Sequence, residues 1–171
     1  MFNWPGLLKY EIVELEQFSG AKATIYSILP YGEKLTLFDG FLNCYKDTYF
    51  NEIVDLIKRL KAIGYATGAR EQFFKLHESR PGENIAALYD KPNKFLRLYC
   101  IRFNNDVIIL GGGGPKTTQT WQEDPNLNYT VNKLRKYSND IYKRIDFGDI
   151  YWSKNRKELE GNLKMDENEE I

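Results

Sequence analysis

The sequence predicts an α+β fold: an antiparallel sheet with helices packed on one face, plus an N-terminal β-hairpin and a C-terminal helix. Segments of alternating polar and apolar residues occur near the N-terminus and again after residue 84, which is typical of strands. Apolar residues recur at helical spacing in two longer segments. In the second half of the chain three strand-like segments follow one another without an intervening helix, which favours antiparallel pairing over βαβ units.

The size of the chain suits one domain. It has 171 residues, of which 42% are hydrophobic and 15% aromatic, and this is enough for a sizeable core. We expect residues 1–150 to form the domain, with the N-terminal hairpin as an extension of it. Residues 151–171 end in MDENEEI. They are polar and acidic, so we expect a flexible tail.

The N-terminal hairpin is predicted from two strand-like segments. Residues 9–18 (KYEIVELEQF) alternate and predict the first strand. Residues 19–22 (SGAK) supply a turn, and residues 23–29 (ATIYSIL) predict the returning strand.

Two helices are expected after the apolar stretch LTLFDGFLNCY. Residues 48–63 place a set of apolar side chains on one helical face. These are Phe50, Ile53, Val54, Ile57 and Leu60. Asp47 or Thr48 is the expected N-cap, and Gly64 is the expected C-terminal stop. We expect a second, shorter helix over residues 69–78.

Three extended segments then predict an antiparallel meander: residues 85–89, 95–103 and 107–111. Asn104 and Asn105 separate the last two segments. Asparagine tolerates a positive φ, so this pair predicts a two-residue type I′ turn.

The C-terminal helix has a clear start signal. Asp124 is the expected N-cap and Pro125 the first helical residue. A stripe of apolar residues follows at helical spacing: Leu127, Val131, Leu134, Ile141 and Ile145. The helix is expected to end near Gly148.

The formal net charge of zero conceals an uneven distribution. Residues 91–144 carry ten basic and four acidic side chains, whereas residues 145–171 carry four basic and eight acidic ones. A basic middle segment fits an anion-binding surface, because phosphate contacts need lysines and arginines on one patch. A solvated charged face explains the same pattern equally well.

Composition also limits the compartment and the cofactors. No run of apolar residues approaches the roughly 18 that a membrane span needs, and MFNWPGLLKY lacks the pattern of a signal peptide. We expect a cytoplasmic protein with no membrane association. Cys44 and Cys100 stand among apolar neighbours and are read as core hydrophobes. With a single histidine and no zinc-ligand spacing, we expect no metal and no cofactor.

The tract LGGGGPKTT, residues 110–118, raises the main functional question. A phosphate-cradling P-loop needs a longer gap between its first glycine and its lysine, and it needs a helix directly afterwards. Here Pro115 precedes Lys116 and no apolar helix follows, so a P-loop is not expected. The run Gly111, Gly112, Gly113 and Gly114 permits close approach instead. It predicts either a bare floor for a base, a sugar or a backbone, or a structural feature, which is a bulge or the crossing of a partner strand.

Arginines in the meander point to both faces of the sheet. Arg97 and Arg102 are five residues apart in one strand, so their side chains face opposite sides. At least one of them needs a partner or a place at the sheet edge, because burying an unpaired guanidinium costs several kcal/mol. Lys91, Lys94 and Lys116 stand at nearby strand ends.

The tract from Ala87 to Gly111, preceded by helices and followed by Gly114-Pro115-Lys116-Thr117, resembles the RelE/ParE/HigB superfamily of toxins from bacterial toxin–antitoxin modules. The strand Phe95-Leu96-Arg97-Leu98-Tyr99 resembles the arginine strand of that family, and Lys116 resembles its basic end. The resemblance covers roughly residues 45–145. It implies a RelE-like fold.

The resemblance also implies an activity, namely ribosome-dependent cleavage of mRNA through metal-independent attack of the 2′-hydroxyl. It implies that Arg97 and Lys116 act at the scissile phosphate. His77 is the candidate proton-transfer group, although a lone histidine is more often a surface or capping residue. Lys91, Lys94 and Arg102 are expected to bind RNA.

A stacking residue and the partners complete this expectation. Trp121 or Tyr129 is expected to stack on a base. The implied partners are a cognate antitoxin protein, the ribosome and mRNA.

Two other functions stay open. Zero net charge, and the absence of a basic pair at Leu88-Tyr89-Asp90, favour a catalytically degenerate relative that acts as a protein-interaction or regulatory module. ParE-like members of the superfamily imply a gyrase-directed toxin as the third reading.

Overall fold

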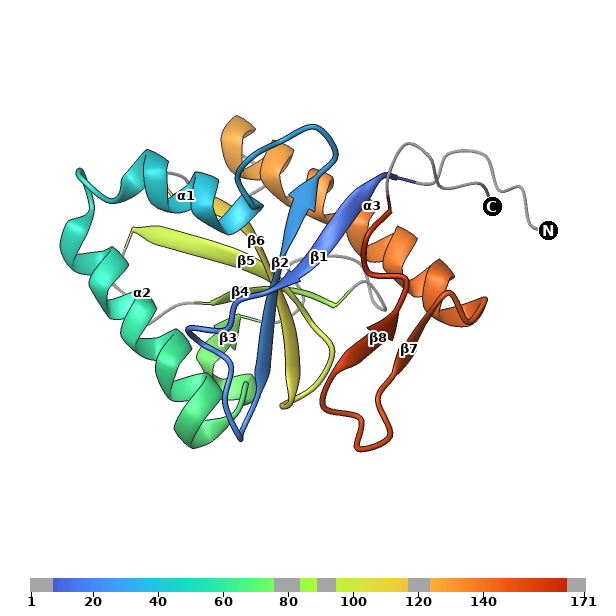
Figure 1. Ribbon diagram of the computed structural model, residues 1–171. Coiled ribbons are helices and arrows are strands. Elements are labelled where there is room, and N and C mark those ends of the chain that lie inside the picture. Colours follow the sequence, from blue (N-terminus) through green and yellow to red (C-terminus); the bar gives the residue numbers. More distant parts are fainter. Residues whose placement is uncertain (1–7, 76–83, 89–94, 117–123, 166–171) are drawn as a thin grey trace.

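The computed structural model describes residues 8–75, 84–88, 95–116 and 124–165, and Figure 1 shows its arrangement. Six strands form one sheet in the order β1-β2-β6-β5-β4-β3. Their bounds are β1 Tyr10–Glu14, β2 Thr24–Pro30, β3 Phe74–Lys75, β4 Ile85–Leu88, β5 Leu96–Arg102 and β6 Val107–Pro115.

The sheet is mixed, which corrects the expectation of an antiparallel sheet. β2 runs parallel to β6, with Thr24 opposite Val107 and Ser27 opposite Leu110, while every other neighbouring pair is antiparallel. The parallel pair results from a crossover connection. After β2 the chain forms two helices and then β3, β4 and β5, and only afterwards does β6 pair with β2. β1 and β2 pair antiparallel and belong to the main sheet.

Helices cover both faces of the sheet, which corrects the expectation that they pack on one face. α1 (Leu37–Tyr45) and α2 (Phe50–Ala62) bury Phe38, Phe41 and Leu56 against one face. α3 (Pro125–Asp146) buries Val131 and Leu134 against the other face. Side chains of β5 alternate between these two cores, since Leu96, Leu98 and Cys100 join the first, and Tyr99 and Ile101 the second.

The first helix was not expected from the sequence. The stretch LTLFDGFLNCY forms α1, and the Thr36 hydroxyl caps it by accepting a hydrogen bond from the Asp39 N–H at 3.1 Å. α2 begins after Tyr49, without a side-chain cap from Asp47 or Thr48. It continues past Gly64 as the π-helical turn η1 (Ile63–Thr67), which ends at Gly68 with φ 74°.

The predicted helix over residues 69–78 is wrong in its described part. That part contains the short 3₁₀ turn η2 (Glu71–Phe73), and then Phe74 enters β3 opposite Leu88. Residues 76–78 lie outside the described residues. Tertiary pairing with β4 overrides the local helical pattern here, because Phe74 is buried in the core as part of a strand.

The turn between β5 and β6 also differs from the prediction. Neither Asn104 nor Asn105 has a positive φ, so the turn is not type I′. Instead, the Asn104 Oδ1 accepts hydrogen bonds from the N–H groups of Asp106 at 2.7 Å and Val107 at 3.0 Å. A local side-chain acceptor therefore replaces the left-handed backbone that was expected.

The start of α3 is as predicted. Asp124 is the N-cap, and its Oδ1 accepts hydrogen bonds from the N–H groups of Asn126 at 2.9 Å and Leu127 at 3.1 Å. Pro125 is the first helical residue, and Gly148 follows the helix with φ 79°.

The expected flexible tail is wrong for residues 151–165. β7 (Ile150–Trp152) and β8 (Leu159–Gly161) pair antiparallel. The chain then runs beside β1, where the Met165 N–H donates to the Tyr10 carbonyl at 2.8 Å. Ile150, Leu159 and Met165 are buried, and this apolar contact explains the regular structure of a segment that is polar in composition.

A buried ion cluster joins β1, α3 and the residues before β7. The Arg144 side chain lies in the core and donates to Asp140 at 2.9 Å and to Asp149 at 2.7 Å. Its Nη2 also donates to the Leu8 carbonyl at 3.2 Å. The Tyr10 hydroxyl donates to Asp140 at 2.7 Å. Each buried charge in the cluster is thus paired, which is the condition under which such charges are tolerated.

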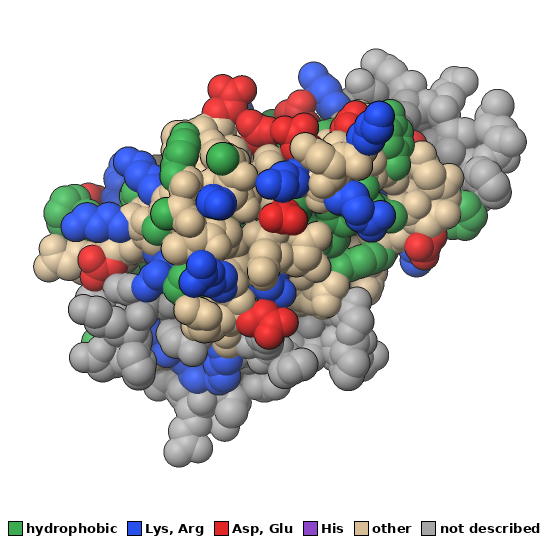
Figure 2. All heavy atoms as spheres, turned by 90° about the horizontal axis from the view of Figure 1, so that it is seen from below, with side chains coloured by type: hydrophobic (Ala, Val, Ile, Leu, Met, Phe, Trp, Pro, Cys, Tyr) green, Lys and Arg blue, Asp and Glu red, His purple; other side chains and the backbone are tan. Residues whose placement is uncertain are grey.

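The face of the molecule shown in Figure 2 carries both signs of charge. Lysine and arginine side chains are interspersed there with aspartate and glutamate, and the hydrophobic side chains lie in small separate groups. The described residues of this face form no continuous basic stripe for a polyanion.

Candidate functional site at the glycine-rich strand

The four glycines continue β6 rather than following it. β6 extends to Pro115, beyond the expected end at Gly111. Leu98 lies opposite Gly113 and Cys100 opposite Leu110, so two residues of β6 face Tyr99 alone in β5. This is a β-bulge, one of the two alternatives that the sequence left open.

The bulge sets different demands on neighbouring glycines. A Cβ atom on Gly113 would lie 1.9 Å from the Arg97 carbonyl oxygen, so only glycine fits there. A Cβ atom on Gly112 would meet nothing closer than the Thr130 methyl group at 3.7 Å. Packing would therefore allow a side chain at Gly112, although the strand has none there.

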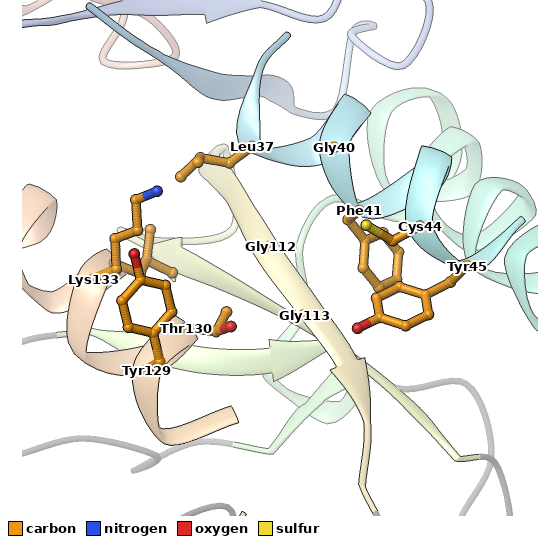
Figure 3. A pocket seen from close by; sticks show the side chains of 11 residues that line it. Leu37, Gly40, Phe41, Cys44, Tyr45, Gly112, Gly113, Tyr129, Thr130 and Lys133 are labelled. Carbon is orange, nitrogen blue, oxygen red and sulfur yellow. The ribbon is translucent and has the colours of Figure 1, made fainter. Parts of the chain in front are cut away.

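A cleft of about 310 Å³ lies over this part of β6, between α1 and α3. Among the described residues, the β2–β6 ladder ends at Ser27 and Leu110, so β2 does not cover the glycines. Figure 3 shows the floor formed by Gly112 and Gly113. α1 contributes Leu37, Gly40, Phe41, Cys44 and Tyr45 to the walls, and α3 contributes Tyr129, Thr130, Lys133 and Leu134.

Tyr45 brings a hydroxyl group to the glycine strand. Its oxygen lies 3.0 Å from the position that a Cβ atom on Gly114 would occupy. Burial raises the pKa of Tyr45, and the nearby Cys44, Asp124 and Tyr49 raise it further. The phenol consequently stays protonated at neutral pH and can donate a hydrogen bond or a proton.

Arg97 and Lys116 occupy nearby backbone positions at the same end of the β5–β6 pair. Arg97 is opposite Gly114, and the Lys116 N–H donates to the Phe95 carbonyl at 2.8 Å. The two side chains are thus two positions apart on one face of the sheet, the face of Tyr99 and α3. Arg97 also donates from Nη1 to the Leu96 carbonyl at 3.0 Å.

Arg102 does not join them. Its guanidinium donates to the Ala69 carbonyl at 2.9 Å and to Asn105 Oδ1 at 2.6 Å, at the opposite end of β5. It also lies over the ring of Phe74, 5.8 Å from the ring centroid, on the opposite face of the sheet. The prediction that Arg97 and Arg102 point to opposite faces is confirmed.

Four other predicted site residues lie outside the described residues: His77, Lys91, Lys94 and Trp121. Of the two cysteines, Cys100 is a core residue as expected. Burial raises the pKa of its thiol to about 12. Cys44 is exposed, which corrects the expectation that it is a core hydrophobe.

Tyr45 and Lys133 are site residues that the sequence did not indicate. Tyr45 was missed because α1 itself was not expected. Lys133 stands four residues after Tyr129, on the same helical side, so the i, i+4 spacing was a signal that could have identified it. In the described part of the chain, no three His, Cys, Asp or Glu side chains are grouped closely enough to hold a metal ion. No described helix is both long and apolar enough to cross a bilayer.

Comparison of the chain with protein-family models, with curated proteins and with solved structures finds no match.

Proposed function

We propose that the protein is a RelE-like toxin of a type II toxin–antitoxin module, an endoribonuclease that cleaves mRNA on the ribosome. The observation that supports this proposal is the backbone register, in which Arg97 lies opposite Gly114 and Lys116, just after β6, bonds to Phe95 two residues before Arg97. Two cations at this spacing suit a single phosphate group, which needs charge stabilisation as it becomes a phosphorane.

The reaction follows from these groups. The 2′-oxygen of the RNA attacks the adjacent phosphorus, and the bond from phosphorus to the 5′-oxygen breaks, leaving a 2′,3′-cyclic phosphate and a 5′-hydroxyl. Arg97 and Lys116 stabilise the additional negative charge on the phosphoryl oxygens. Tyr45 is the candidate donor of a proton to the departing 5′-oxygen, because its protonated hydroxyl lies beside Gly114, opposite Arg97. His77 is the candidate base for the 2′-hydroxyl proton.

The test is a matched pair of double variants, expressed from an inducible promoter. Arg97→Ala with Lys116→Ala removes two positive charges from the proposed site. Lys58→Ala with Lys61→Ala removes two charges from the exposed side of α2. We expect growth arrest and new transcript ends with the wild type and with the α2 variant, and neither with the site variant. Thermal melting of the purified proteins checks that both variants fold.

Toxicity that is equal in the two double variants contradicts the proposal. So does the absence of cyclic-phosphate ends on ribosome-bound message incubated with the purified wild-type protein.

A second candidate function is a catalytically degenerate RelE-like protein that binds a partner protein, such as a cognate antitoxin, or regulates its operon. The interspersed charges on the face in Figure 2 and the formal net charge of zero favour it, since neither indicates a broad polyanion surface. Cleavage of ribosome-bound message by the purified protein at a measurable rate contradicts this second candidate.

A further inference from the structure

A second hollow of about 300 Å³ adjoins the cleft along α3. The two hollows share Tyr129 and Lys133 in their walls. The second hollow also includes Lys136 and Tyr137 of α3 and Leu8 at the start of the described chain. Because Tyr129 and Lys133 line both hollows, the two are neighbours along α3, and we call the pair the α3 groove.

Helical spacing places the aromatic and basic residues of this groove on one side of α3. Tyr129, Lys133, Lys136 and Tyr137 are separated by four, three and one residues, so they occupy one side of α3. Tyr129 is 68% exposed, the largest exposed fraction among the large hydrophobic side chains of the described residues. Figure 3 shows its ring beside Lys133 and across the cleft from Cys44 and Tyr45.

The charge of the groove has one sign. Lys133 and Lys136 supply two ammonium groups, and neither hollow has an aspartate or glutamate among its lining residues. Carboxylates outside the lining do act on it: burial raises the pKa of Tyr137 and of Tyr45, and the charges of Glu33 and Asp124 raise these two values further. The Asp140 Oδ1 accepts a hydrogen bond from the Leu8 N–H at 3.4 Å. An exposed ring flanked by lysines is the arrangement that binds a base by stacking and its phosphates by charge.

We propose that this side of α3 binds single-stranded RNA, with one base stacked on Tyr129 and neighbouring phosphates held by Lys133 and Lys136. The inference deepens the proposed function, on which it rests, by naming the path along which the RNA reaches the glycine floor. Sequence preference is not expected here, since stacking on an aromatic ring accepts any base.

The first experiment measures binding separately from cleavage. Fluorescence anisotropy of a labelled 2′-O-methyl oligouridylate with the full chain reports affinity, and this oligonucleotide has no 2′-hydroxyl to react. Tyr129→Ala should weaken binding about fivefold or more, because one stacked base contributes about 1–3 kcal/mol. Tyr129→Phe should keep the affinity within about twofold, since it keeps the ring. Tyr151→Ala, at an exposed tyrosine of β7, is the matched control and should change nothing.

Salt dependence and thiol protection test the two sides of the groove. Lys133→Gln and Lys136→Gln should each reduce the slope of log affinity against log salt by about 0.7. The oligonucleotide should also slow the alkylation of Cys44, which lies in the opposite wall. Cys100 gives no background in this assay, because it is buried and the pKa of its thiol is about 12.

The outcomes separate this inference from the proposed function. Tyr129→Ala that binds as tightly as the wild type overturns the inference and leaves the nuclease assignment standing. Loss of binding in Tyr129→Ala, together with no cleavage by the wild type on ribosomes, supports the RNA surface and overturns the nuclease. A polyglutamate peptide that binds while the oligonucleotide does not overturns the inference in favour of an acidic protein partner.

Discussion

At the scale of single residues, the glycine run has two separate explanations. Gly113 is required by the bulge, where the Arg97 carbonyl occupies the space of any side chain. Packing does not require a glycine at position 112, and the missing side chain there affects only the space that the cleft offers to a ligand. The sequence showed that close approach was possible. It could not show which glycine needs it, because that depends on where the register of β5 shifts.

Replacing these two glycines by alanine should therefore give opposite results. Gly113→Ala should lower the free energy of unfolding by about 2 kcal/mol or more, since the backbone of β5 or β6 must move to accept the Cβ atom. Gly112→Ala should change it by less than about 1 kcal/mol, and it can stabilise the strand by reducing the entropy of the unfolded chain. Urea unfolding of both variants measures the difference, and equal destabilisation would show that the bulge is misplaced.

The buried Arg144 depends on its carboxylate partners in the same way. Asp140→Ala removes the partner on the previous helical turn and leaves the buried guanidinium with Asp149 as its remaining carboxylate and the Leu8 carbonyl. We expect a loss of about 3–5 kcal/mol in the free energy of unfolding. Lys143→Ala, which changes a neighbouring exposed cation of α3, is the control and should cost less than about 1 kcal/mol. A loss of similar size in both variants would contradict a specific role for the cluster.

At the scale of elements, the sequence predicted those whose signals are local. Asp124 and Pro125 marked the start of α3, and its apolar stripe gave the buried side. The helix over residues 69–78 failed because Phe74 pairs with β4, a contact that periodicity cannot reveal. α1 failed for another reason. Gly40 stands inside it, and a glycine within a helical pattern lowers the expectation of a helix.

One contact between α2 and β5 holds the start of β5, next to Arg97. Glu52 of α2 accepts hydrogen bonds at one carboxylate oxygen from the N–H groups of Phe95 at 2.7 Å and Leu96 at 3.1 Å. It ties the start of β5 to the start of α2. Glu52→Ala should therefore speed amide hydrogen exchange at Phe95 and Leu96 by about tenfold, because each amide loses its protein acceptor.

Glu52→Gln keeps a carbonyl acceptor and is the matched control, with a smaller increase expected. Exchange that is unchanged at both amides in Glu52→Ala would show that the carboxylate does not restrain the strand. Reduced toxicity of Glu52→Ala, with the cations of the site intact, would link this restraint to the proposed activity.

At the scale of the whole molecule, the sheet has a core on each face, and this arrangement limits how much of the site can be predicted from the sequence. The antiparallel pairing of β5 with β6, which brings Arg97 towards Lys116, was predictable from the sequence, whereas the bulge that sets Arg97 opposite Gly114 was not. The cleft was not predictable. Its walls come from α1 and α3, which pack against opposite faces of the sheet and both contact β6.

Tyrosine side chains buried in the core predict a loss of stability at alkaline pH. Tyr10 and Tyr26 lie in the core under α3. Burial raises the pKa of both phenols, that of Tyr26 to about 12, and the charge of Asp140 further raises that of Tyr10. Burial also raises the pKa of the Cys100 thiol to about 12. In the unfolded chain these groups lose their protons near pH 8.5 for cysteine and about 10 for tyrosine.

Above those values the folded state binds more protons than the unfolded state, so the free energy of unfolding falls as the pH rises. Each group contributes a slope of up to about 1.4 kcal/mol per pH unit, between its pKa in the unfolded chain and its pKa in the folded protein. Urea unfolding at pH 7.5, 9, 10 and 10.5 should show little change at first and then a steepening loss. Tyr10→Phe should be less stable at pH 7.5, because it loses the hydrogen bond to Asp140, yet it should show a shallower loss above pH 10. An equal slope in the two proteins would mean that the Tyr10 hydroxyl titrates in the folded state as it does in the unfolded chain, which its burial against Asp140 does not allow.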